Sequence, residues 1–312
     1  MYVKRNLSVW ASEIAEYLNR ELHGRDFLVK EPSTYSHLRS SSILYLESDG
    51  DLGKFVLDGC SDILFLTPKP LPEDDRYAFI VSECPKLDFV LTVHEFMVRH
   101  IERSIDESAI IEKGASIGRN VYIGANARIG PDVRIDNNVV ILNNVVLSGS
   151  IHIGSDATIK DNAVIGSEGY VFVYNNEKKP LHVPHLGEII IGERVWVGSN
   201  STIERAEIID TVIEQDVKID DLVHIGGGCR IGAFSMLTAG TVLSRNVEIG
   251  KRCWLAPNVS VKEGIFIESH SIVGIGSVVL HNLPGRGVFI GTPARLSKKV
   301  EMKDNERDAS FF

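Results

Sequence analysis

Two histidines and a run of glycines are the residues best suited to proton transfer and close ligand contact. His224 lies in the stretch VHIGGGCRIG at 223–232, and His185 lies in the stretch KPLHVPHLG. An unperturbed histidine titrates near pH 6.5, so either side chain is a candidate proton carrier. Gly227 is the middle glycine of its run, whose backbone could approach a ligand closely and donate N–H groups to an oxyanion. Alternatively, the histidines have only a structural role, and the glycines form a tight corner.

The composition excludes several classes of protein. A net charge of -9 over 312 residues argues against nucleic acid as a partner. Polar and acidic residues interrupt the N-terminal region where a signal peptide needs an apolar core, and no run of about 18 apolar residues exists to span a membrane. The cysteines lack the spacing of a disulfide framework or a zinc site. We therefore expect a cytoplasmic protein with free thiols and no metal site.

The elements that position these residues are predicted by an aliphatic residue at every sixth position. The pattern runs over 111–165 and 213–279 without a miss, and four positions over 191–209 keep the same step before a slip of two. A period of six is neither helical nor simple strand alternation, and it fits coils of flat strands joined by sharp corners. The aliphatic side chains point inward, and the Gly, Asn or Asp that follows each one accommodates the turn. Such coils are stabilised by stacking on one another.

Breaks in the pattern predict the domain organisation. Residues 1–105 lack the six-residue step and form a small α/β domain, and residues 106–284 form the coils. Within the coils, residues 166–188 predict an inserted β-hairpin with an Asn-rich turn. Such an excursion is a plausible binding loop, although its aromatic residues could instead pack it against the coil wall. Residues 285–312 form a closing segment with a polar tail.

Three stretches resemble UDP-3-O-acylglucosamine N-acyltransferases, the lipid A enzymes that acylate a sugar amine. They are SILYL, SECPKLDFVL and the long block IGSEGYVFV…KPLHVPHLGEIIIGERVWVGSNSTIERAEIIDTVIEQDVKIDDLVHI. They are similar to the family's DISFL, NPYLAF, IGSDGFGF, PQLG and TTIDRG…DDTVI patterns, over most of residues 8–250. The resemblance implies a mainly β fold, a left-handed parallel β-helix with a small N-terminal α/β domain and a short C-terminal segment. It also implies a homotrimer with sites between adjacent coils.

The resemblance also implies residues that bind the acceptor. Tyr45 matches one of the two aromatic positions that sandwich uracil in the family, while the other falls near Asp51. Glu204 and Arg205 match the family's IDRG motif and either orient the acceptor or form a structural ion pair. Asp221 either binds the sugar amine or forms a corner.

The family's catalytic histidine falls at Gly227 in this chain, whereas the first position of its motif is kept at His224. A neutral amine attacks a thioester without a base, but a hydroxyl acceptor depends on one. The chain therefore favours N-acylation over O-acylation. His224 and His185 are the remaining catalytic candidates, and the missing side chain at Gly227 could make room for the acceptor or acyl group.

The C-terminal stretch VFIGTPARLSKK resembles the v.GNPAK ending of CoA-dependent hexapeptide acetyltransferases. Gly274, Gly276 and Gly291 would give room for the pantetheine arm. Arg295 and Lys298 would meet the CoA phosphates, with a solvated charge run as the alternative.

Together these features predict an N-acyltransferase that moves an acyl group from acyl-CoA to the amine of a nucleotide-linked amino sugar for surface glycans. Acyl-CoA would be a co-substrate, and no cofactor would be bound permanently. Two alternatives stay open. One is the lipid A enzyme itself, using acyl carrier protein, and the other is a non-catalytic β-solenoid that binds a glycan or scaffolds a complex.

Overall fold

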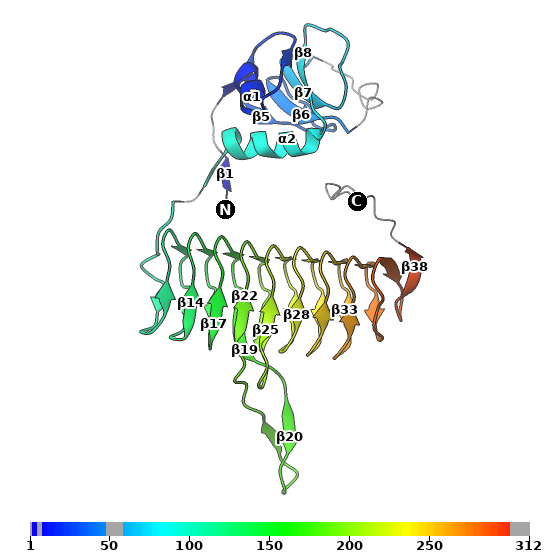
Figure 1. Cartoon of the computed structure of the whole chain (residues 1–312). Helices are drawn as coiled ribbons and strands as arrows, with labels where there is room; N and C mark the ends of the chain where they lie inside the picture. Colours follow the sequence, from blue (N-terminus) through cyan, green and yellow to red (C-terminus); the bar gives the residue numbers. More distant parts are fainter. Residues whose placement is uncertain (1, 5–7, 48–58, 101, 300–312) are drawn as a thin grey trace. The chain divides into compact units, whose positions relative to one another are not determined.

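The computed structural model describes residues 2–4, 8–47, 59–100 and 102–299, and the chain divides into two compact units after Glu102. Figure 1 shows unit 2 as coils stacked in chain order, with a hairpin extending away from the stack. The Asp51 position lies outside the described residues.

Unit 1 is a five-stranded sheet with the order β3-β8-β7-β6-β5, in which only the β3–β8 pair is antiparallel. Its central strands β7 and β8 are apolar runs buried on both faces, as parallel strands under helices usually are. Among the described residues, no helix is long and apolar enough to cross a membrane. The bounds are β1 Tyr2–Lys4, β2 Val9–Trp10, α1 Ala11–Tyr17, β3 Leu22–His23, β4 Leu28–Val29, β5 Glu31–Pro32, β6 Ser42–Tyr45, β7 Ile63–Thr67, β8 Tyr77–Val81, α2 Pro85–Thr92, the π-helix Val93–Met97 and β9 Val98–His100.

Unit 2 consists of three parallel sheets, which we name the first, second and third walls. The first wall comprises β10 Ile110–Ile111, β13 Arg128–Ile129, β16 Val146–Leu147, β19 Val164–Glu168, β24 Thr202–Arg205, β27 His224–Ile225, β30 Val242–Leu243, β33 Ser260–Val261 and β36 Val278–Val279. The second wall comprises β11 Ser116–Ile117, β14 Val133–Ile135, β17 Ile151–Ile153, β22 Ile189–Ile191, β25 Thr211–Ile213, β28 Arg230–Ile231, β31 Glu248–Ile249 and β34 Phe266–Ile267.

The third wall closes the coils and ends in a reversed strand. It comprises β12 Tyr122–Ile123, β15 Val140–Ile141, β18 Thr158–Ile159, β23 Trp196–Val197, β26 Lys218–Ile219, β29 Met236–Leu237, β32 Trp254–Leu255, β35 Ile272–Val273, β37 Gly287–Ile290 and β38 Arg295–Lys299. The strand β37 pairs with β35 in parallel, whereas β38 pairs with β37 antiparallel.

The inward positions form one continuous apolar core. Each aliphatic residue stacks on its equivalent in the next coil, as Ile129 does on Leu147. Both are buried, and the same cluster continues along the whole stack. Since one coil has no core of its own, this stacking supplies the stability. The predicted mainly β solenoid is therefore confirmed.

The corners take their left-handed residue at a different place from the one we expected. The positive φ falls on the third residue after the inward aliphatic, as at Asn120, Asn126 and Asn138. Asparagine tolerates this region better than most residues. The glycine directly after the aliphatic has another role. A Cβ on Gly118 would lie 2.6 Å from the backbone of Asp136, so glycine there allows adjacent coils to approach closely.

The coil that follows the hairpin is longer than an ordinary coil, which corrects the expectation that Ile209 keeps the six-residue step. Thr202 pairs with His224 across 22 residues, whereas corresponding corner residues in an ordinary coil, such as Arg119 and Asn137, are 18 apart. Ile209 is not an inward residue, because it is 55% exposed. The extra residues between β24 and β25 therefore bulge out of the coil, and we name residues 206–210 the bulge.

The four cysteines are free and differ in accessibility. Burial raises the pKa of Cys229 to about 12 and that of Cys253 to about 11. Because thiolate is the reactive form, we expect iodoacetamide at pH 8 to modify exposed Cys84 well before either buried thiol. Mass spectrometry of a time course checks this order. Early labelling of Cys229 in the folded protein would contradict it.

Candidate functional site

The inserted hairpin joins the coils on the first wall. Its strands are β20 Phe172–Tyr174 and β21 Pro180–His182, which pair antiparallel. The strand β19 leads into the hairpin, and β24 lies beside β19, so that Glu168 is opposite Arg205. The structure thus brings together two residues that are far apart in the sequence at the base of the predicted loop.

Arg205 clamps the two ends of the hairpin. Its Nε donates to the carbonyl oxygen of Gly166 at 2.7 Å, and its Nη1 donates to that of His185 at 3.0 Å. Its Nη2 lies 3.7 Å from Oε1 of Glu168. A Cβ at Gly149 would lie 2.7 Å from Nε of Arg205, so a side chain there would push the guanidinium out of its place. The planar fork reaches several acceptors at once, which a lysine could not do.

His185 is buried at this base. The residue is only 1% exposed, and neither nitrogen of its ring has a hydrogen-bond partner among the described residues. Its ring stacks on that of His182, with centroids 5.3 Å apart. Its Nε2 and Oε2 of Glu204 both lie 3.0 Å from the point where a Cβ of Gly169 would sit. The structure therefore places the predicted residues His185, Glu204 and Arg205 in one cluster.

His224 lies on the neighbouring strand of the same wall. It begins β27, which pairs with β24, and its Nδ1 lies 2.8 Å from Oγ1 of Thr202. Its side chain is half-buried, in contrast to that of His185. Among the described residues no hydrogen bond to its Nε2 is found, so this nitrogen is the one that could meet a substrate.

The glycine run supports the bulge and does not open space. A Cβ at Gly227 would lie 2.4 Å from the carbonyl oxygen of Arg205, so the backbone beside the bulge fills that place. The N–H of Gly228 donates to Oγ1 of Thr211 at 2.9 Å, and that of Gly226 donates to a carbonyl of the next coil. A side chain at position 227 therefore has no room within this chain, and the role of Gly227 toward an acceptor or acyl group stays a prediction.

Asp221 and Tyr45 each contact other residues of the chain that have no predicted role in the site. Oδ1 of Asp221 accepts from Nζ of Lys160 and from the backbone N–H of Ser199, both at 2.7 Å. The Lys160 hydrogen bond is the largest cause that lowers the pKa of Asp221. Tyr45 ends β6 in unit 1 and packs on Phe89, with ring centroids 5.3 Å apart. The roles of both residues in acceptor binding stay predictions.

The predicted donor residues gather at one corner. Gly274 and Gly276 follow β35, and Gly291 follows β37, which is the next strand of the third wall. A Cβ at Gly274 would lie 2.7 Å from Ile290, whereas no atom lies within 4 Å of one at Gly276. Arg295 begins β38 and is exposed, and Lys298 lies on the same strand. This corner has open space at Gly276, but its use by CoA stays a prediction.

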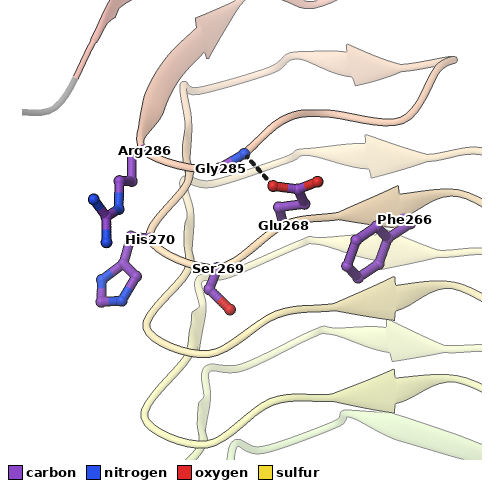
Figure 2. Close-up of a pocket in the computed structure, with 6 residues that line it drawn as sticks. All are labelled: Phe266, Glu268, Ser269, His270, Gly285 and Arg286. Atoms are coloured by element: carbon purple, nitrogen blue, oxygen red, sulfur yellow. Dashed lines mark hydrogen bonds between the residues drawn. The ribbon is translucent and has the colours of Figure 1, made fainter.

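A surface hollow of about 590 Å³ lies at a different corner, between the second and third walls (Figure 2). In it, the backbone N–H of Gly285 donates to Oε2 of Glu268 at 3.1 Å. The lining residues are Phe266, Glu268, Ser269, His270, Gly285 and Arg286. None of the site residues predicted from the sequence lines this hollow.

One cluster of possible metal ligands was not predicted from the sequence, for which we expected no metal site. Glu168, His182 and His185 each offer a ligand atom, and these atoms all lie within 4.8 Å of one another. The His-x-x-His spacing in the hairpin was the available signal. Glu168 lies on the other side of the hairpin, so its proximity depends on the strand register.

Comparisons with known families agree with the coils. The model of the bacterial transferase hexapeptide (six repeats) matches residues 210–245, and that of the hexapeptide repeat of succinyl-transferase matches residues 114–149. The chain is 33% identical over 143 residues to a UDP-3-O-acylglucosamine N-acyltransferase of Methylococcus capsulatus, covering 46% of this chain and 40% of that relative. A protein of the same name from Hahella chejuensis is 33% identical over 138 residues, covering 44% of this chain and 39% of that relative. The chain thus spans less than half the length of these relatives in the matched part.

Solved structures share the fold. The UDP-N-acetylglucosamine acyltransferase of Campylobacter jejuni superposes with a TM-score of 0.57 at 21% identity, covering 63% of this chain and 75% of that one. LpxA of Acinetobacter baumannii gives a TM-score of 0.56 at 24% identity, covering 62% of this chain and 72% of that one. The coils, the six-residue step and these matches identify the chain as a hexapeptide-repeat protein related to acyltransferases.

Proposed function

We propose that the chain is an N-acyltransferase that acts on the amine of a nucleotide-linked amino sugar. The relatives named UDP-3-O-acylglucosamine N-acyltransferase support acyl transfer to such a sugar. The observation that supports an amine over a hydroxyl acceptor is the filled space at Gly227. No side chain fits there to act as a base, and an amine that is neutral needs none for its attack.

The reaction follows from this choice. The amine lone pair attacks the thioester carbonyl carbon, the carbonyl oxygen becomes an oxyanion, and the carbon–sulfur bond then breaks. The oxyanion re-forms the carbonyl as the thiolate leaves, and the amine nitrogen loses a proton. A proton carrier near the first wall that takes this proton and passes it to the thiolate speeds the collapse. We assign this carrier to His224, because it is half-buried on the wall face with Nδ1 held by Thr202. His185 remains the second candidate, although its ring is enclosed.

Two acyl donors fit the proposal. The C-terminal resemblance and the open corner at Gly276 support acyl-CoA. The second candidate donor is acyl carrier protein, which the family resemblance implies for lipid A synthesis. The names of the relatives favour this reaction, in which the acceptor is a 3-O-acylated UDP-glucosamine. We also propose that the protein acts as a homotrimer, which light scattering would test against the chain mass of 34.5 kDa.

A thiol-release assay tests the proposal. Acyl-CoAs and acylated acyl carrier proteins of several chain lengths are each combined with UDP- and dTDP-linked amino sugars, and with the same sugars carrying a hydroxyl in place of the amine. We expect release with amines only. Turnover only with carrier-bound long chains would select the lipid A reaction. Failure to bind or acylate any of these sugars would refute the enzyme proposal and leave a binding solenoid.

Histidine variants test the proton carrier. His224→Ala should lower turnover about ten-fold, which is less than the usual general-base effect of about 100-fold or more, because the amine attacks while neutral. The exposed His152, which lies 3.1 Å from Asp136, gives the matched control, and His152→Ala should leave turnover unchanged. The role assigned to His224 is wrong if His224→Ala turns over at the full rate, and a loss in His185→Ala instead would move it to that residue.

A further inference from the structure

The base of the hairpin holds a cluster of possible metal ligands, one of which is buried without a hydrogen-bond partner among the described residues. Glu168 comes from the end of β19, His182 from the end of β21, and His185 from the segment that returns to the coils. Their ligand atoms lie within 4.8 Å of one another. Carboxylate and imidazole are ligands that zinc-type cations accept.

His182 is oriented like a metal ligand. Its Nε2 lies 3.0 Å from the carbonyl oxygen of Gly169, and a carbonyl only accepts, so the proton of the neutral ring is on Nε2. The other nitrogen, Nδ1, then presents a lone pair to Oε2 of Glu168 at 3.4 Å. Two acceptors face each other unless a proton or a cation lies between them. A backbone carbonyl that holds the second ring nitrogen is the usual support of a metal-bound histidine.

The separation of these two atoms suits a tetrahedral ion. Bonds of about 2.0–2.1 Å from zinc to nitrogen or oxygen place neighbouring ligand atoms about 3.4 Å apart. Nδ1 of His182 and Oε2 of Glu168 are already 3.4 Å apart. The ligand atom of His185 lies within 4.8 Å of the other two ligand atoms. The ring of His185 is therefore the group that has to move closer for all three to bind one ion.

His185 supplies the strongest sign of a missing partner. Burying a polar group without a hydrogen bond is costly, and native proteins nearly always avoid it. Both ring nitrogens of His185 are buried and unpaired among the described residues, and the residue is 1% exposed. A bond from one nitrogen to a cation would offset this cost.

The charges around the cluster leave one carboxylate oxygen available. Nη2 of Arg205 lies 3.7 Å from Oε1 of Glu168, on the oxygen that does not face His182. Glu204 adds a second negative charge, with Oε2 on the same side of Gly169 as Nε2 of His185. The two carboxylates therefore offset the guanidinium and leave a cation favourable at the centre.

We propose that Glu168, His182 and His185 bind a divalent transition-metal cation of the zinc type, with Glu204 or water as the fourth ligand. The ion would join both ends of the hairpin (green in Figure 1) to the first wall and fix the loop beside the candidate site. The proposal does not depend on the acyl-transfer activity.

Metal titration of the full chain tests it. The protein is stripped with chelator and dialysed, then titrated with Zn²⁺ against a chromophoric chelator and with Co²⁺ by visible absorption. We expect one zinc per chain, d–d bands of four-coordinate cobalt, and a higher melting temperature with zinc. His182→Ala and His185→Gln should each weaken zinc binding by at least about ten-fold and abolish the thermal shift.

Two further variants keep the test decisive if a ligand variant folds poorly. Gly169→Ala deletes no ligand but places a methyl 3.0 Å from His185 and Glu204, and it should also weaken zinc binding. His152→Ala removes a histidine that also faces a carboxylate, Asp136, and should bind zinc as the wild type does. The proposal is overturned if the wild type takes up no zinc. It is equally overturned if folded His182→Ala and His185→Gln variants bind zinc with wild-type affinity.

Discussion

A histidine introduced at Gly227 is expected to destabilise the protein without providing a base. Its Cβ would lie 2.4 Å from the carbonyl oxygen of Arg205, a contact that real Cβ atoms do not make. The backbone of β24 or the corner at Gly227 would have to move, and overpacking of this kind costs about 1–3 kcal/mol or more. We expect Gly227→His to lower the melting temperature by roughly 5 °C, measured by circular dichroism, and to lower thiol release.

The control for this variant occupies the same corner position in another coil. Ala239 is also the second residue after an inward aliphatic, but it is half-buried and already carries a Cβ. Ala239→His should therefore leave the melting temperature nearly unchanged. A Gly227→His protein that melts like the wild type and releases thiol faster would show that the backbone yields and that this histidine acts as a base.

Replacing Arg205 by alanine is expected to detach the base of the hairpin. The variant removes two hydrogen bonds to part-buried carbonyls and the charge opposite Glu168. Charge-assisted hydrogen bonds contribute about 1.5–3 kcal/mol each, so we expect a loss of about 3 kcal/mol in the free energy of unfolding. Urea unfolding measures this loss. Trypsin should also cut faster after Lys178, which is exposed on the hairpin.

Two further variants serve as comparisons for Arg205→Ala. Arg205→Lys keeps the charge but not the planar fork, and it should recover only part of the lost stability. Arg230→Ala removes an exposed arginine from β28 and should change stability by less than about 0.5 kcal/mol. If Arg205→Ala proves as stable and as resistant to trypsin as Arg230→Ala, the clamp is not a structural requirement.

Much of this fold follows from the sequence because the coil is a local, repeated unit. The inward position of Ile225 depends only on its equivalents in adjacent coils, so a constant step predicts it. The hairpin is also local, with β20 and β21 on either side of an Asn-containing turn. Chain order alone was enough to place His185 near the base of that hairpin.

The rest required the register between coils. The bulge turns Ile209 outward and brings the backbone of Arg205 over Gly227, and neither effect is visible in a six-residue step. The approach of Glu168 to His182 likewise depends on how β19 leaves the first wall. For Gly227 the sequence left two explanations open, room for a ligand and a tight corner, and the contact of a Cβ with Arg205 depends on packing between coils that the sequence does not show.

The reversal of β38 has a consequence for self-association. A stack of parallel strands ends in unpaired amides, which another copy could extend into a growing fibre. On the third wall β38 runs the other way, and it carries the cationic residues Arg295 and Lys299 along that edge. An approaching coil would meet a strand that runs in the opposite direction and cationic side chains that it would have to desolvate. Removal of this strand should thus convert a protein of fixed length into one prone to polymerise end to end.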